Sequence, residues 1–267
     1  MAEAYKASRM LRIHALMPIL SMVVIGILQI VFMTPLYNPL ALSQVSPAKR
    51  IEFIASSIAD FVAYTGIAAA VFSLFTWLFM GLAAIHILRL TISKFEYLGL
   101  MIVIVASVSS LLLGYNSIMI RDIVYTSSLK ALSKPEIASL IANMGVHLNE
   151  KELEMYVKAV AEALSGIRNT STGFTIGLVA LTLSIIPPIL AILSLEPIAR
   201  MLESKWPRIL QLLLILMSLH LVLPLLPLPN VSLISTILGL VNILEPIAAW
   251  LTATRIKGFV EKKLLEV

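Results

Sequence analysis

The chain has 267 residues, of which 59% are hydrophobic and 13% are charged. Soluble domains carry about 25% charged residues, so a chain of this composition cannot cover itself with polar surface and is predicted to be an integral membrane protein. The net charge of +5 has a topological explanation, because no basic stripe interleaved with aromatic residues indicates nucleic-acid binding. The absence of cysteine excludes disulfides, thiolate catalysis and iron–sulfur clusters.

The first region of the chain, residues 1–118, predicts three membrane-spanning helices, each of which needs about 20 apolar residues. A basic N-terminal segment precedes the first apolar run, Ile13 to Leu36, which is too long for the core of a signal peptide. Near 51–66, polar and apolar residues separate onto two helical faces, which predicts a helix lying along the membrane interface. The second and third spans follow at about Ile67 to Leu90 and Phe95 to Ile118.

Residues 119–172 are the only stretch that resembles a water-soluble protein. Ser133 to Glu136 form a capping box with a proline in the first helical turn, and Asn149 with Glu152 start a second helix in the same way. Apolar residues at helical spacing follow each start. The stretch therefore predicts an extracytoplasmic helical hairpin that packs on its own spans or on a partner.

The last region, residues 173–267, predicts three further spans and a basic tail. The spans cover about Gly173 to Leu195, Ile209 to Pro227 and Val231 to Thr254. Lys and Arg gather in the short segments that would lie inside, whereas the short outer loops carry few of them. The prediction is thus an all-α, multi-pass protein of the cell membrane with six spans and both termini in the cytoplasm.

Glu245 is the strongest candidate for a functional residue, because a carboxylate inside an apolar span needs a structural partner or a function. Pro246 cannot donate to the carbonyl of Asn242, and Pro187 and Pro188 free two carbonyls of the fourth span in the same way. Carboxylate, amide and freed carbonyl oxygens bind cations or pass protons in the broken helices of transporters. The competing interpretation is a structural carboxylate that is protonated or bonded to a neighbouring helix.

Five letters around Glu245 repeat an earlier stretch. Leu195-Glu196-Pro197-Ile198-Ala199 matches Leu244-Glu245-Pro246-Ile247-Ala248, and both copies lie toward the inner ends of their spans. Glu196 is predicted to lie at the inner interface, where Arg200 is one helical turn away. Chance or a shared way of ending a span explains the repeat as well as duplication does.

Histidines raise the question of haem. His14 and His86 both lie near the inner ends of their spans, so they could ligate one haem b between helices. The alternative is that both are structural histidines bonded within the helix bundle. His220 and Glu245 differ in depth by about six residues, which predicts no direct contact. No other cofactor and no metal site is predicted.

The sequence contains no recognised catalytic pattern, so an enzyme is not expected. A subunit or scaffold of a membrane assembly is narrowly preferred, with other membrane subunits or further copies of the chain as partners beside the lipid bilayer. The alternative is a cation- or proton-coupled small-molecule transporter or channel that uses Glu245, and a haem-bearing electron-transfer subunit is third. The scaffold is favoured by the lack of catalytic patterns, by a hairpin suited to docking and by the scarcity of buried charge. A translocation path usually needs more than one buried ionisable group, and the sequence offers only Glu245.

Overall fold

A computed structural model shows the architecture of the chain. It describes residues 2–37, 39–91, 95–142, 151, 154–159, 171–202, 204–222 and 240–265. The described part is 94% helical and contains no strand, which confirms the predicted all-α class. Four of its helices are long and apolar enough to cross a membrane, namely Ala2–Thr34, Pro47–Leu90, Tyr97–Leu132 and Ile176–Met201.

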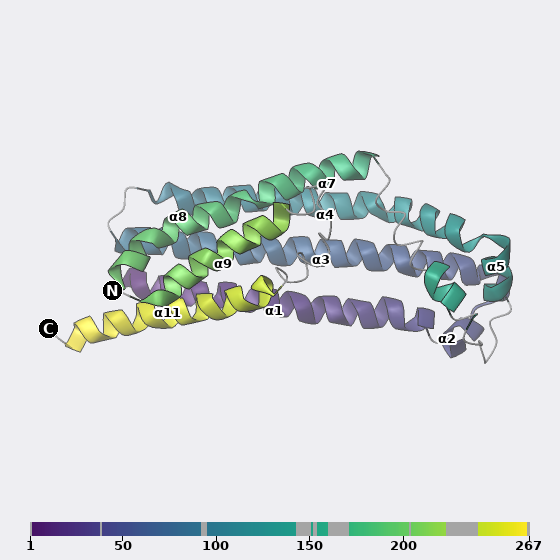
Figure 1. Ribbon diagram of the computed structural model, residues 1–267, viewed down its shortest axis with the longest axis horizontal. Coiled ribbons are helices and arrows are strands. Elements are labelled where there is room, and N and C mark those ends of the chain that lie inside the picture. Colours follow the sequence, from purple (N-terminus) through teal and green to yellow (C-terminus); the bar gives the residue numbers. More distant parts are fainter. Residues whose placement is uncertain are drawn as a thin grey trace. The chain divides into compact units, whose positions relative to one another are not determined.

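Three long helices make up most of the first half of the chain (Figure 1). They are α1 (Ala2–Tyr37), α3 (Pro47–Leu90) and α4 (Tyr97–Leu132), of 36, 44 and 36 residues. At 1.5 Å per residue they measure about 54, 66 and 54 Å, which exceeds the roughly 30 Å of a hydrocarbon core. Residues 51–66 and the predicted second span are therefore parts of one continuous helix, and α4 extends well past the predicted end of the third span.

Shorter helices complete the described part. They are α2 (Pro39–Ser43), α5 (Pro135–Ala142), α7 (Ser171–Ser184), α8 (Ile186–Met201), α9 (Lys205–Val222) and α11 (Val241–Leu265). The predicted fourth span is thus two helices that meet at Ile185, because the two prolines that open α8 cannot donate to the end of α7. The predicted fifth and sixth spans are described up to Val222 and from Leu240, and the turn between them lies outside the described residues.

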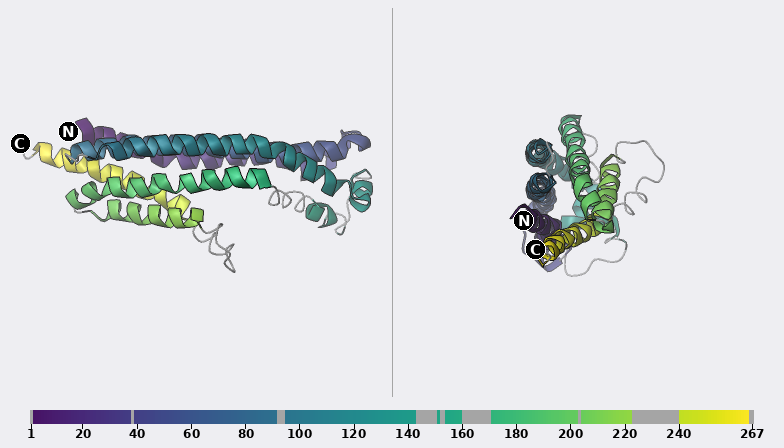
Figure 2. Two further views of the ribbon diagram at one scale, coloured as in Figure 1. Left: turned by 90° about the horizontal axis from the view of Figure 1, so that it is seen from above. Right: turned by 90° about the vertical axis from the view of Figure 1, so that its left-hand side faces the viewer.

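The chain divides into two compact units. Unit 1 comprises Met1–Ser21, Ala70–Leu111 and Leu178–Val267, and unit 2 comprises Met22–Ala69 and Leu112–Gly177. In unit 1, α9 packs against both α8 and α11 (Figure 1), and Figure 2 shows these helices from two further directions.

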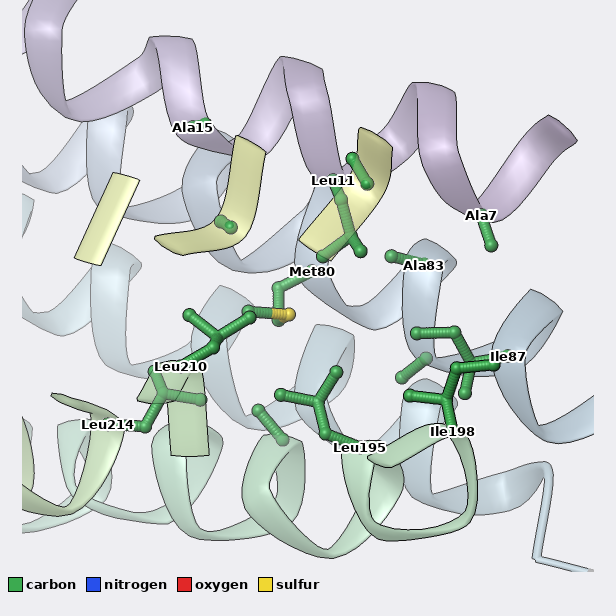
Figure 3. Close-up of a cluster of buried hydrophobic side chains, with 14 of the residues drawn as sticks. Ala7, Leu11, Ala15, Met80, Ala83, Ile87, Leu195, Ile198, Leu210 and Leu214 are labelled. Carbon is green, nitrogen blue, oxygen red and sulfur yellow. The ribbon is translucent and has the colours of Figure 1, made fainter. Parts of the chain in front are cut away.

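The core of unit 1 is built from α1, α3, α4, α8, α9 and α11, and Figure 3 shows part of it. Its buried side chains are large aliphatic residues and methionine alternating with alanine, so neighbouring helices approach closely and the bulky residues fill the space between them. The members labelled in the figure are Ala7, Leu11, Ala15, Met80, Ala83, Ile87, Leu195, Ile198, Leu210 and Leu214.

Unit 2 has a core of its own, to which α5 and residues 154–159 contribute. The Tyr156 hydroxyl donates to the carbonyl of Leu36 at 3.0 Å, and buried Arg50 donates to the carbonyl of Ala142, at the end of α5, at 2.9 Å. These described parts of the predicted hairpin therefore pack on other residues of unit 2. The connection between them lies outside the described residues.

The face of 51–66 that was expected to meet lipid headgroups is also covered. Ile54 and Ile58 are both completely buried in the core of unit 2. In the structure this apolar face meets other residues of the chain.

Candidate functional site

The buried carboxylate of α11 has a partner on α1. Glu245 Oε1 lies 2.7 Å from His14 Nε2, and the two side chains are 5% and 1% exposed. Both residues belong to unit 1. The sequence placed Glu245 in a transport hypothesis and His14 in a haem hypothesis, and the structure joins the two residues in one pair.

A third helix, α3, holds the histidine from its other side. His14 Nδ1 lies 2.9 Å from the backbone carbonyl oxygen of Thr76, and the ring of Trp77 packs at 6.2 Å between centroids. The Thr76 hydroxyl donates to its own helix at Phe72, so this side chain does not compete for the imidazole. With both ring nitrogens bonded, the imidazole is fixed in position and orientation.

This geometry determines how many protons the pair holds. A carbonyl oxygen can only accept, so His14 Nδ1 must carry a hydrogen and donate to Thr76. The 2.7 Å contact between Nε2 and Glu245 then needs one further proton, which belongs either to the imidazolium or to the carboxylic acid. Both forms are neutral overall. Removing that proton would leave a buried charge of −1 with two lone pairs facing each other.

Two other predicted site residues lie beside the pair. Asn242, in the first turn of α11, is half-buried, and Pro246 is buried next to Glu245. Because Pro246 has no N–H, the Asn242 carbonyl lacks the donor that an α-helix normally supplies. The carboxylate and this carbonyl are oxygen ligands one helical turn apart on the same helix.

The prolines of the fourth span belong to a different polar position. Pro187 and Pro188 are buried in the first turn of α8, three and four residues after Ser184. Ser184 Oγ lies 2.5 Å from Ser109 Oγ of α4 and donates to the carbonyl of Ala180 at 2.8 Å. Among the described residues, the side-chain contact of Ser184 is thus with α4, whereas the side-chain contact of Glu245 is with α1.

His86, the other residue of the haem hypothesis, is bonded elsewhere. Its Nδ1 lies 2.5 Å from Oε2 of Glu3, near the start of α1. His14 is level with Thr76, ten residues before His86 on α3, so the two histidines are separated by roughly 15 Å along the helix. The shared depth on which the haem hypothesis depended is not found.

Gly81, on the same helix as His86, lies at a close contact between two helices. A Cβ atom added to Gly81 would lie 2.7 Å from the carbonyl oxygen of Gly99, so the glycine lets α3 and α4 of unit 1 approach closely. The space beside it is already occupied by the neighbouring helix.

Comparison with known proteins adds no relative: no family model matches the chain, and no curated protein or solved structure matches it either. What the fold and site define is a class, a helical protein whose described residues include four helices long and apolar enough to span a membrane. Its distinguishing feature is the buried pair of His14 and Glu245.

Proposed function

We propose that the protein is a membrane transporter that exchanges protons for a monovalent cation at the pair formed by His14 and Glu245. The observation that carries the proposal is the buried hydrogen bond of 2.7 Å between the two side chains. Ionisable groups within spans are costly and mark proton and ion pathways by default.

The proton count supports exchange. A hydrogen bond between His14 Nε2 and Glu245 Oε1 at 2.7 Å requires one proton between the imidazole and the carboxylate, and a pair that holds it is neutral. When that proton leaves, the site carries a charge of −1, which is unfavourable in a low-dielectric interior unless a single positive charge replaces it. A monovalent cation restores neutrality, and the Glu245 carboxylate and the freed Asn242 carbonyl supply the oxygen atoms that such ions prefer. Proton and cation would therefore exclude each other from one site.

The scaffold function was preferred in part because the sequence offered a single buried ionisable group. His14 is a second one, in direct contact with the first, and this weighs against that preference. The transporter is accordingly the function that we propose, and the scaffold becomes the outcome expected if no ion movement depends on the pair.

The test is a flux measurement in proteoliposomes that contain a pH-sensitive dye. Gradients of Li⁺, Na⁺, K⁺ or tetramethylammonium are applied from outside, with the membrane potential clamped by an ionophore for an ion that is not under test. For at least one cation, inward movement is expected to drive protons out and raise the internal pH. The variant Glu245→Gln cannot lose the shared proton to form a carboxylate, so the signal is expected to disappear.

Glu261→Gln is the matched control, since Glu261 lies on the same helix and forms only an exposed pair with Lys257. It should transport as the unmodified protein does. Proton movement that persists in Glu245→Gln would contradict the proposal. A folded protein that moves no protons with any of the four cations would favour the scaffold.

A further inference from the structure

We propose that Arg12 and Trp250 form a binding site for the phosphate of an anionic phospholipid headgroup. The site is distinct from the proton pair and does not depend on the proposed transport. It lies in unit 1, where α1 and α11 run side by side.

The seam between the two helices is defined by three contacts. Ser8 donates to the carbonyl of Ala253 at 2.8 Å, Arg12 lies over the ring of Trp250 at 5.3 Å, and His14 bonds Glu245. Numbers rise along α1 as they fall along α11, so the helices are antiparallel neighbours over this length. Arg12 and Trp250 therefore face each other between the contact of Ser8 with Ala253 and the buried pair of His14 and Glu245.

One donor of Arg12 has no acceptor among the described residues. That donor is the Nε group, which is buried. The ion pairs formed between described residues do not include Arg12 either. A guanidinium is always charged, and its planar fork matches a phosphate in a bidentate geometry. An anion with several oxygen atoms would pair with the guanidinium that is held over the ring of Trp250.

The position of the site selects a lipid as the source of that anion. Arg12 directly precedes Ile13–Leu36, a run without Lys, Arg, Asp or Glu, so it marks the point where the chain leaves the headgroup region. Trp250 is 42% exposed, and tryptophan is enriched at this level of a membrane. Exposed Arg9, one helical turn before Arg12, adds a second positive charge on the same face.

The opposing explanation is that Arg12 simply extends to water, as long basic side chains do near helix ends. Stacking over an aromatic ring with a buried Nε is a different arrangement, because it holds the guanidinium against the helix surface. The two explanations differ in whether the surface around Trp250 prefers anionic over zwitterionic lipid.

The experiment measures that preference directly. Trp77 and Trp206 are replaced by Phe, which leaves Trp250 as the only tryptophan. The protein is placed in nanodiscs with increasing fractions of brominated phosphatidylglycerol or brominated phosphatidylcholine, which quench nearby tryptophan. Phosphatidylglycerol is expected to quench Trp250 at a lower fraction, and Arg12→Gln is expected to reduce the preference by about fivefold. Arg12→Lys keeps the positive charge but lacks the planar guanidinium, so it should lose part of the preference for phosphatidylglycerol.

Lys263→Gln is the matched control, because Lys263 also stacks on an aromatic ring, Phe259, at 5.1 Å. The control should keep the full preference for phosphatidylglycerol. Equal preference in the parent protein and in a folded Arg12→Gln variant would overturn the proposal. Displacement of phosphatidylglycerol by millimolar inorganic phosphate would also overturn it, since the site would then take a soluble anion.

Discussion

The two Glu-Pro segments of unit 1 share five letters and have opposite environments. Glu196 is 47% exposed and bonds Arg200, one turn along its own helix, at 2.8 Å. Glu245 is 5% exposed and bonds a histidine on another helix, 231 positions away in the sequence. Identical local sequence therefore produces a solvated surface pair in one place and a buried proton-sharing pair in the other.

The difference teaches that a carboxylate takes its role from the helices around it. The second acceptor oxygen of Glu196 receives a hydrogen bond from Gln211 of α9 at 3.1 Å, so its neighbours are an amide and an arginine that is always charged. The partner of Glu245 is a buried imidazole on another helix. One copy of the motif is therefore paired with a permanent charge, and the other with a titratable side chain.

The largest expected effect comes from removing each carboxylate in turn. Glu245→Ala leaves His14 Nε2 buried without a partner, and breaking a buried pair in this way costs about 3 kcal/mol or more. Glu196→Ala removes an exposed pair and should change stability little. Unfolding of the purified protein by heat or denaturant measures both variants, and equal destabilisation would show that the two environments do not differ as described.

Removing both members of the buried pair should reverse much of that loss. In the double variant His14→Leu with Glu245→Leu, neither polar group is left unpaired, so the protein should be more stable than either single variant by about 1 kcal/mol or more. For comparison, Glu196 and Arg200 are replaced singly and together. The effects of these two substitutions on stability should nearly add, which means little coupling between them. A double variant less stable than both singles would mean that the pair does not act as a unit.

The prolines offer a smaller and more selective test. Pro246→Ala restores the donor for the Asn242 carbonyl, and the regained hydrogen bond should stabilise the helix by about 1 kcal/mol. If that carbonyl binds the transported cation, apparent affinity in the liposome assay should fall at the same time. Pro197→Ala, beside Glu196, should leave cation affinity unchanged, and a loss of affinity in both variants would remove the distinction between the two segments.

The smallest effect concerns salt. Exposed ion pairs are screened as ionic strength rises, whereas buried pairs are screened much less. The small coupling between Glu196 and Arg200 should therefore decline from low salt to 1 M, while the coupling between His14 and Glu245 should persist. Double-variant cycles repeated at two salt concentrations measure this, and parallel decline in both pairs would indicate that water reaches Glu245.

Much of the candidate site was predictable, but its central contact was not. Glu245 stood out because it interrupts an apolar run, and Pro246 and Asn242 followed from local geometry. Depth alone pairs His14 with His86, because both lie near the inner ends of their predicted spans. Depth pairs His14 with Glu245 equally well, since both belong to the inner halves of their predicted spans. It could not show which helices are neighbours.

Composition and spacing by themselves determined the class of this protein: all-helical, apolar enough for a membrane, with a carboxylate that needs an explanation. Hydrophobicity and helix periodicity are local properties, so they are readable along the chain. Tertiary packing decided the rest. In the structure, residues 51–66 and the second predicted span form one helix, α3. Ile54 and Ile58 are buried in the core of unit 2, and His14 contacts Glu245. Contacts between distant helices depend on how side chains fill one another's gaps, and no local pattern encodes that choice.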